Sequence, residues 1–156
     1  MRVFVLSIIV LFALALPAQS QSRMDIRGTV GGTRPFLDEP MGALGGGALL
    51  FHFGQRLAIG PEFLFSSVSG FRDRSVMAIG AFSLSPWTNR ISPYVTGTIG
   101  LVRDHDTRID YTSQEWTASG GVGVRISFLN HLFIAPEIRL GSHAFPMAAL
   151  HLGYSF

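Results

Sequence analysis

The last ten residues of the chain, MAALHLGYSF (147–156), decide its fold. Counting back from the terminus, every second residue is apolar, and the run ends in two aromatic residues: Ala148, Leu150, Leu152, Tyr154 and Phe156. A period of two places successive side chains on opposite faces of a β-strand. The segment therefore predicts a strand with one apolar face that continues to the end of the chain.

Similar segments recur along the rest of the sequence, separated by clusters of Gly, Pro, Asn, Asp and Ser. With the C-terminal one they predict eight strands, at 24–33, 42–53, 57–66, 75–84, 91–102, 114–128, 132–140 and 147–156. Their length suits strands that cross a bilayer, which need about 9–11 tilted residues. Segment 75–84 is apolar on both faces, so the pattern leaves its register open.

The links between these strands alternate in length. Links 34–41, 67–74 and 103–113 are long and polar, whereas 54–56 and 129–131 have three residues each; 85–90 and 141–146 fit the alternation less well. Outer-membrane barrels join an even number of strands by longer extracellular loops and short periplasmic turns. This order predicts that both termini lie in the periplasm.

The composition supports a lipid-facing sheet. Charged residues make up 14% of the chain, against about 25% in a soluble domain, yet no apolar run reaches the ~20 residues of a membrane helix. In lipid every backbone polar group must be paired, so a spanning sheet has to close on itself. We therefore predict an all-β fold, an eight-stranded antiparallel up-and-down transmembrane β-barrel with side chains filling its lumen.

The N-terminus has the features of an export signal. Arg2 precedes an apolar stretch at 3–16, Pro17 follows, and Ala18 and Ser20 place small residues at a cleavage-like spacing. This pattern predicts a cleavable signal peptide at 1–20, within two residues, and a barrel domain at 21–156 in the outer membrane of a Gram-negative bacterium. The chain has no Cys, which excludes disulfides, thiolate metal sites and a lipid on an N-terminal cysteine.

Three segments resemble known barrel strands. The C-terminal segment resembles the signature that the barrel-assembly machinery recognises, with an assembly signal at Leu150, Leu152, Tyr154 and Phe156. ISPYV (91–95) followed by Gly97 and Gly100, and GPEF (60–63), resemble strands of the outer-membrane β-barrel superfamily that includes opacity-type and outer-membrane-protein-X-type proteins. RLAIGPEFLF (56–65) and HLFIAPEIRL (131–140) also align in register. The resemblance implies a small integral outer-membrane barrel.

Charged residues fall on the strand faces opposite the large apolar side chains. They are Asp25, Arg27, Glu62, Arg125, Glu137 and Arg139, with His151 on the same face of the last strand. An arginine facing lipid at mid-depth costs about 2–4 kcal/mol, so this face should be the lumen. We expect a lumen plugged by Arg–carboxylate pairs, with Arg125 near Glu137 and with Asp25 or Arg27 near His151. The alternative is a path for protons or ions.

Two further groups are predicted at the membrane boundaries. Arginines in the expected extracellular links could contact lipopolysaccharide phosphates: Arg34, Arg72, Arg74, Arg103 and Arg108. Aromatic residues near strand ends are expected in an interfacial girdle: Trp87, Tyr94, Trp116, Phe128, Tyr154 and Phe156.

Enzymatic signals are weak. Lipid A deacylases are eight-stranded barrels with a His-x-Ser pair, but no histidine here has Ser two positions later. The oxygen-rich segment 103–113 lacks the glycine and bidentate Glu of a calcium loop, so neither a metal nor a cofactor is predicted. A net charge of +2 does not indicate nucleic-acid binding.

The leading hypothesis is a monomeric, non-enzymatic membrane protein with a structural or surface-interaction role. Its expected partners are outer-membrane lipid, lipopolysaccharide and the assembly machinery. The alternatives are an outer-leaflet lipid A-modifying enzyme, a small diffusion pore, or a secreted lipocalin-type barrel with a polar exterior and an apolar interior.

Overall fold

A computed structural model describes residues 23–34, 41–68, 71–106, 111–142 and 146–156. Within them lie eight strands: β1 (Met24–Thr33), β2 (Gly42–Phe53), β3 (Leu57–Val68), β4 (Phe71–Ser83), β5 (Ile91–Asp106), β6 (Tyr111–Ser127), β7 (Leu132–Gly141) and β8 (Met147–Ser155). The described part of the chain contains no helix long and apolar enough to cross a membrane. The signal peptide expected at 1–20 lies outside the described residues.

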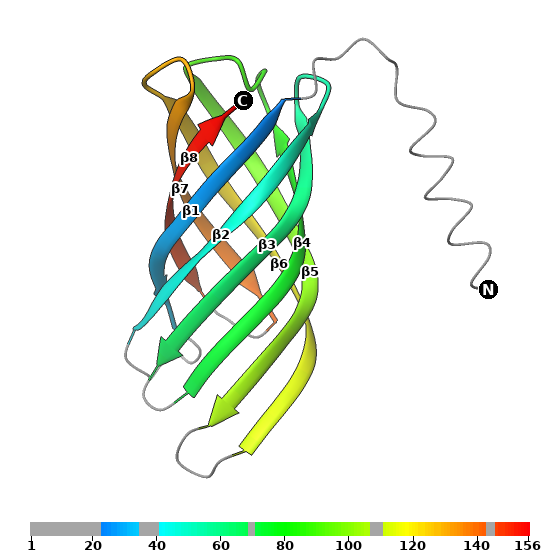
Figure 1. The fold of residues 1–156 in the computed structure, drawn as a ribbon, viewed down its shortest axis with the longest axis vertical. Helices are drawn as coiled ribbons and strands as arrows, with labels where there is room; N and C mark the ends of the chain where they lie inside the picture. The colour runs from blue at the N-terminus through cyan, green and yellow to red at the C-terminus, as the bar shows by residue number, and fades with distance from the viewer. Residues whose placement is uncertain (1–22, 35–40, 69–70, 107–110, 143–145) are drawn as a thin grey trace, which may run out of the picture.

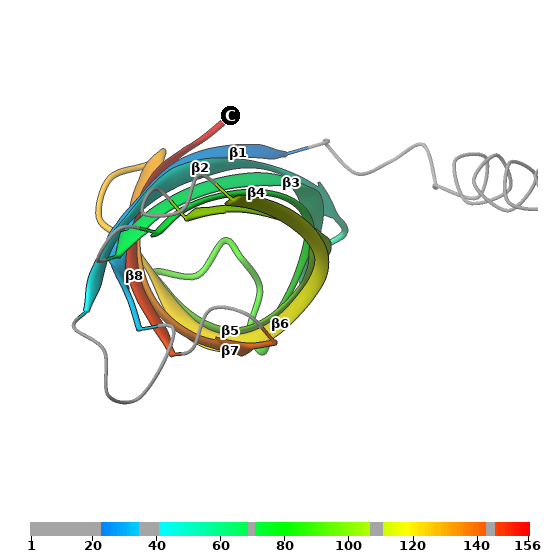
Figure 2. The same ribbon diagram turned by 90° about the horizontal axis from the view of Figure 1, so that it is seen from below.

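The eight strands form one closed barrel. Each strand pairs antiparallel with its neighbour in sequence, and β1 pairs with β8 to close the ring. The backbone N–H of Phe156 bonds to the Met24 carbonyl at 2.8 Å, at the end of this seam. Figure 1 shows the strongly tilted strands, and Figure 2 shows the ring from below. The predicted fold, a closed eight-stranded antiparallel up-and-down barrel, is confirmed.

The two ends of the barrel are distinguished by the chain termini. β1 begins and β8 ends at the same end, at the top of Figure 1, which we call the termini end. The three-residue turn 54–56 lies there as well, and its Gly54 has a φ of 69°, a left-handed conformation that glycine adopts without strain. The opposite end, which carries the links after β1, β3, β5 and β7, is called the far end.

The sheet is apolar outside and polar inside. Among the described residues, 25 large hydrophobic side chains are exposed, whereas 16 polar or charged residues are buried. Neighbours on β3 illustrate the alternation, since Phe63 is 48% exposed and Glu62 is 0% exposed. This distribution is the inverse of a soluble barrel, because the apolar side chains face the surroundings.

The strand boundaries agree with prediction at the termini end and differ at the far end. β1 and β2 match the predicted ranges, but β3 and β4 leave only residues 69–70 between them, and β5 and β6 leave only 107–110. The predicted loops at 67–74 and 103–113 are therefore wrong. In these segments the backbone hydrogen bonds between strands continue, but both faces of the sheet carry polar side chains. The alternation of apolar and polar residues that predicts a strand is therefore absent. β5 and β6 project beyond the other strands in Figure 1.

The register of β4, which the sequence left open, is set by its neighbours. Met77, Ile79 and Ala81 face the lumen, and Val76 and Phe82 face outward. β4 is apolar on both faces because its inner face packs against other lumen side chains.

The link between β4 and β5 folds back into the barrel at the termini end. Figure 2 shows this green segment bending into the ring. The Trp87 side chain is only 6% exposed, and its backbone N–H bonds to the Gln55 carbonyl at 3.0 Å. Tyr94 also points inward, at 3% exposure.

The girdle prediction is therefore wrong for Trp87 and Tyr94, because both rings fill the lumen. The other four aromatic residues of that prediction are exposed on the outside: Trp116, Phe128, Tyr154 and Phe156.

Candidate functional site

The lumen is the candidate site, and it is built in layers that follow the strand registers. An aromatic and apolar cluster around Trp87, Tyr94 and Phe133 lies nearest the termini. The first of two charged groups lies beside this cluster, and the second lies on the side of it that faces the far end. A second apolar cluster, which includes Leu64 and Met77, lies nearer the far end, and a small cavity follows.

The first charged group is centred on Asp25 of β1. Arg125 Nη1 donates a hydrogen bond to Asp25 Oδ2 at 2.5 Å, and Arg125 Nη2 donates one to Ser155 Oγ at 2.6 Å. His52 Nε2 lies 2.9 Å from Asp25 Oδ2. The Arg125 guanidinium also stacks on the Phe133 ring, 3.9 Å from its centroid. This group ties β1, β2, β6 and β8 together beside the Trp87 ring.

The second charged group is centred on Glu62 and Glu137. Arg27 Nη2 and Arg139 Nη2 each donate a hydrogen bond to Glu62 Oε1 at 2.9 Å. Arg139 Nε also bonds to Glu137 Oε1. The Tyr94 hydroxyl donates a hydrogen bond to Glu137 Oε2 at 2.7 Å. The two carboxylates are thus joined through one guanidinium.

The buried charges balance. Three guanidiniums, of Arg27, Arg125 and Arg139, face three carboxylates, of Asp25, Glu62 and Glu137, and each residue is at most 4% exposed. Buried charges are costly unless they are paired and hydrogen-bonded. The lumen meets this requirement with no charge left over in these two groups, which makes it a packed, cross-linked interior.

All seven residues that the sequence analysis assigned to the lumen lie inside the barrel, but one of the expected contacts is replaced. Arg125 pairs with Asp25, where the sequence suggested Glu137. His151 contacts Thr29 and Glu137, and the charge of Arg27 lies close enough to act on it, as the sequence suggested. Strand adjacency alone misleads for Arg125, because its long side chain reaches across the lumen to β1, which is not a neighbour of β6.

Sequence reasoning missed several lumen partners. They are Thr29, His52, Trp87, Tyr94 and Ser155. His52, Thr29 and Ser155 share the strand face of the charged residues, so the alternation contained a signal for them. Nothing in the sequence shows that the link carrying Trp87 turns inward.

One contact chain in the lumen has the connectivity of a nucleophile, a base and an acid. The Thr29 hydroxyl lies 2.8 Å from His151 Nδ1, and His151 Nε2 lies 3.4 Å from Glu137 Oε2. All three residues are at most 3% exposed, and neither Thr29 nor His151 lines the far-end cavity. Within the described residues, this contact chain is enclosed by the packing of the lumen.

The lumen has little free space. A cavity of about 70 Å³ lies at the far end, and one of about 10 Å³ lies beside Asp25 and Trp87. On this measure a water molecule needs about 10–15 Å³. The second space therefore holds one water at most, and Glu62 and His151, both at 0% exposure, lie in the layer between.

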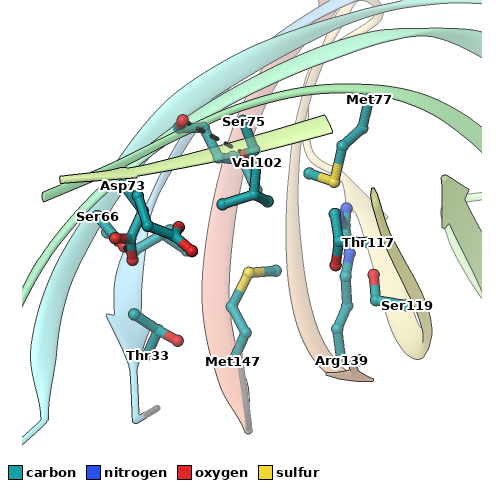
Figure 3. A pocket seen from close by; sticks show the side chains of 14 residues that line it. Thr33, Ser66, Asp73, Ser75, Met77, Val102, Thr117, Ser119, Arg139 and Met147 are labelled. Carbon is teal, nitrogen blue, oxygen red and sulfur yellow. Dashed lines mark hydrogen bonds between the residues drawn. The ribbon is translucent and has the colours of Figure 1, made fainter. Parts of the chain in front are cut away.

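The larger cavity, which we call the far-end cup, is rich in hydroxyl groups. They belong to Thr33, Ser66, Ser75, Thr117 and Ser119. Figure 3 shows Thr33, Ser66 and Asp73 on one side of the cup and Thr117, Ser119 and Arg139 on the other. The two sides come from β1, β3 and β4 and from β6 and β7.

Known structures share this architecture. The N-terminal β-barrel domain of OprF from Pseudomonas aeruginosa aligns with a TM-score of 0.64 and 20% identity, over 88% of this chain and 100% of that one. The chain has the fold of the small outer-membrane barrels. Neisserial surface protein A aligns with a TM-score of 0.62 and 11% identity, over 87% and 95%. OprG from P. aeruginosa aligns with a TM-score of 0.62 and 11% identity, over 86% and 96%.

The sequence by itself matches no family model and no curated protein. At these identities the likeness shows the fold alone. Within the outer-membrane barrel fold, the C-terminal residues Leu150, Leu152, Tyr154 and Phe156 all face outward on or just after β8.

The predicted extracellular arginines are only partly brought together. Arg72, Arg74 and Arg103 lie on strands rather than in loops, and their exposed side chains face outward. Arg74 and Arg103 are direct cross-strand partners. Arg34 follows β1, away from this patch, and Arg108 lies outside the described residues.

Proposed function

We propose that the chain is an integral outer-membrane barrel with a structural or surface-interaction role, non-enzymatic and plugged by its own side chains. The observation that carries the proposal is the inside-out sheet, with large apolar side chains outside and paired charges inside. Such a surface is stable where lipid contacts the outer face.

The packed lumen favours a plug over a pore. An aqueous channel needs a continuous polar passage, and eight strands leave an interior that side chains fill. The arginine–carboxylate groups occupy the middle, and Trp87 occupies the termini end.

The histidines support a non-enzymatic role. His52 and His151 are buried in the lumen. His131 stacks on Tyr154, with ring centroids 5.3 Å apart, and its Nδ1 lies 2.8 Å from the Ser155 carbonyl oxygen. None of these three presents a serine and a carboxylate to the lipid boundary.

The outward arginine patch supports contact with lipopolysaccharide. Like charges directly opposite each other in a sheet repel, and Arg74 faces Arg103. A phosphate between the two guanidiniums would relieve this repulsion and accept hydrogen bonds from both. The patch lies at the far end, next to the outward Val76 and Leu101 in the apolar band. We therefore propose that the far end faces the outside of the cell and that the termini face the periplasm.

The outward face of the last strand supports assembly by the barrel-assembly machinery. Leu150, Leu152, Tyr154 and Phe156 form a continuous apolar row that ends in aromatic residues. We propose that the folded barrel is a monomer, since β1 pairs with β8 and the sheet closes on itself.

The test is a heat-modifiability gel on fractionated cells that express the full chain. A band that sediments with the outer membrane and migrates faster unboiled than boiled supports the proposal. A band in the soluble periplasmic fraction would contradict it. A changed lipid A mass spectrum on deletion of the protein would contradict the non-enzymatic role alone.

A further inference from the structure

The far-end cup differs from the rest of the lumen in its charge. Deeper in the barrel three guanidiniums balance three carboxylates. The charged residues that line the cup are Asp73, Asp104 and Arg139. Arg139 is already paired with Glu62 and Glu137, and Asp104 has an interaction partner of its own. The carboxylate of Asp73 therefore gives the cup a negative charge.

Asp73 is the carboxylate best placed to receive a ligand. It accepts a hydrogen bond from Ser66 Oγ at 2.7 Å, and within the described part of the chain it has no ion-pair partner. Its sequence neighbours Arg72 and Arg74 face outward from the same strand, so they do not neutralise it inside the cup.

Thr33 supplies a second, independent observation. Thr33 is only 2% exposed, and it lines the cup. Its hydroxyl has no hydrogen-bond partner among the residues that the structure describes. Buried polar groups in proteins are almost always satisfied, so this hydroxyl calls for a partner inside the cup.

Part of the cup wall is apolar. Leu64, Met77 and Met147 line it at 4–8% exposure. Ca²⁺ and Mg²⁺ take six or more oxygen ligands with carboxylates among them, and within the described residues no group of three or more His, Cys, Asp or Glu could hold a metal ion. An ammonium group needs fewer acceptors, and the methylenes attached to it would pack against leucine and methionine. A cavity of about 70 Å³ suits a group of this size.

We propose that the far-end cup binds the ammonium end of a linear alkylamine. Asp73 forms the ion pair, the Thr33 hydroxyl accepts a second ammonium hydrogen, and Leu64, Met77 and Met147 contact the alkyl chain. The site is a binding site for a small organic cation and goes beyond the structural role proposed above.

The test is calorimetric titration of the full chain, folded in zwitterionic detergent micelles, with 1,4-diaminobutane. We expect saturable binding at one site. Asp73→Asn should weaken binding by at least tenfold, and Thr33→Val, which keeps the shape but removes the hydroxyl, by about three- to tenfold. Arg90→Gln, an exposed arginine at the termini end, is the control and should leave the affinity unchanged. Butan-1-ol, which has the same chain length without the charge, should not bind.

Absence of saturable diamine binding would overturn the proposal, as would equal affinity in the Asp73→Asn variant. Displacement of the diamine by equimolar Mg²⁺ would show a metal site instead and would also overturn it. Each variant is first checked for the heat-modifiable band. Because that band reports the barrel and the titration reports the cup, failure of this proposal leaves the proposed outer-membrane role intact.

Discussion

Arg139 Nη2 donates a hydrogen bond to Glu62 Oε1 over 2.9 Å and so joins β7 to β3 across the lumen. The two residues are 77 positions apart in the sequence, and their strands are not neighbours in the sheet. The barrel wall is therefore held by its backbone ladder and also braced internally by side chains.

Removing the acid of this brace should destabilise the barrel. Glu62→Ala leaves the guanidiniums of Arg27 and Arg139 with one carboxylate fewer in a buried site. Loss of one partner of a buried pair costs about 3–5 kcal/mol, and we expect a loss of this size in the free energy of unfolding. Urea unfolding of the barrel in lipid vesicles measures it.

The double variant Glu62→Leu, Arg139→Met is the matched comparison. It keeps the charge balance, with Arg27 left beside Glu137 at 3.8 Å, so it should be clearly more stable than Glu62→Ala. If the single and double variants were equally destabilised, the pairing would not be the source of the effect.

The fluorescence of the two tryptophans should show that they lie on opposite sides of the barrel wall. Trp87 is 6% exposed and lies in the lumen, whereas Trp116 is 71% exposed on the outer face. In the Trp116→Phe variant, fluorescence from Trp87 should resist quenching by brominated lipids and by acrylamide. In Trp87→Phe, fluorescence from Trp116 should be quenched. Strong quenching of Trp87 by brominated lipid would place its ring outside the barrel.

The lumen leaves no room for a side chain at position 153, so we expect that Gly153 cannot be replaced without loss of stability. A Cβ there would lie 2.1 Å from the Phe133 ring, which is held under Arg125. Overpacking of this kind costs about 1–3 kcal/mol, so Gly153→Ala should lower the free energy of unfolding by that amount. Gly97→Ala is the control, since nothing lies within 4 Å of a Cβ at Gly97. Equal effects of the two substitutions would contradict the lumen packing.

The outward arginines should contribute to lipopolysaccharide affinity. Replacing Arg74 and Arg103 with Gln removes two exposed charges, each of which contributes about 0.2–1 kcal/mol to an ion pair. We expect the affinity for bisphosphorylated lipid A in micelles to fall about three- to tenfold. Arg90→Gln, an exposed arginine at the termini end, should change nothing. An unchanged affinity in the double variant, or an equal loss with dephosphorylated lipid A, would argue against phosphate contact.

The strand pattern was predictable where lipid and lumen impose opposite demands on the two faces. β1, β2 and the face assignment of β7 and β8 follow from alternation, because most of their large apolar residues face outward and their charged residues face inward. At the far end both faces of β4 to β6 are polar, and the alternation that marks a strand is lost. The predicted loops there were wrong for this reason.

The sequence predicts which residues face the lumen much better than it predicts which of them contact one another there. Asp25 and Arg125 are 100 residues apart, and their contact depends on the stagger of the strands around the ring. The inward turn at Trp87 has no periodic signal at all. Its only trace in the sequence is that the link 85–90 is longer than a tight turn at this end requires.

The most direct test of the inside-out membrane barrel is a spin-label scan along β8. The chain has no Cys, so single cysteines can be introduced without removing any. Labels at Ala148, Leu150 and Leu152 of the barrel in lipid bilayers should collide readily with oxygen, and a label at Ala149 should not. Accessibility to oxygen with a period of two, and low accessibility to a polar nickel reagent at both sets, is the predicted result. High nickel accessibility at Leu150 and Leu152 would mean that this face meets water, which would contradict the account.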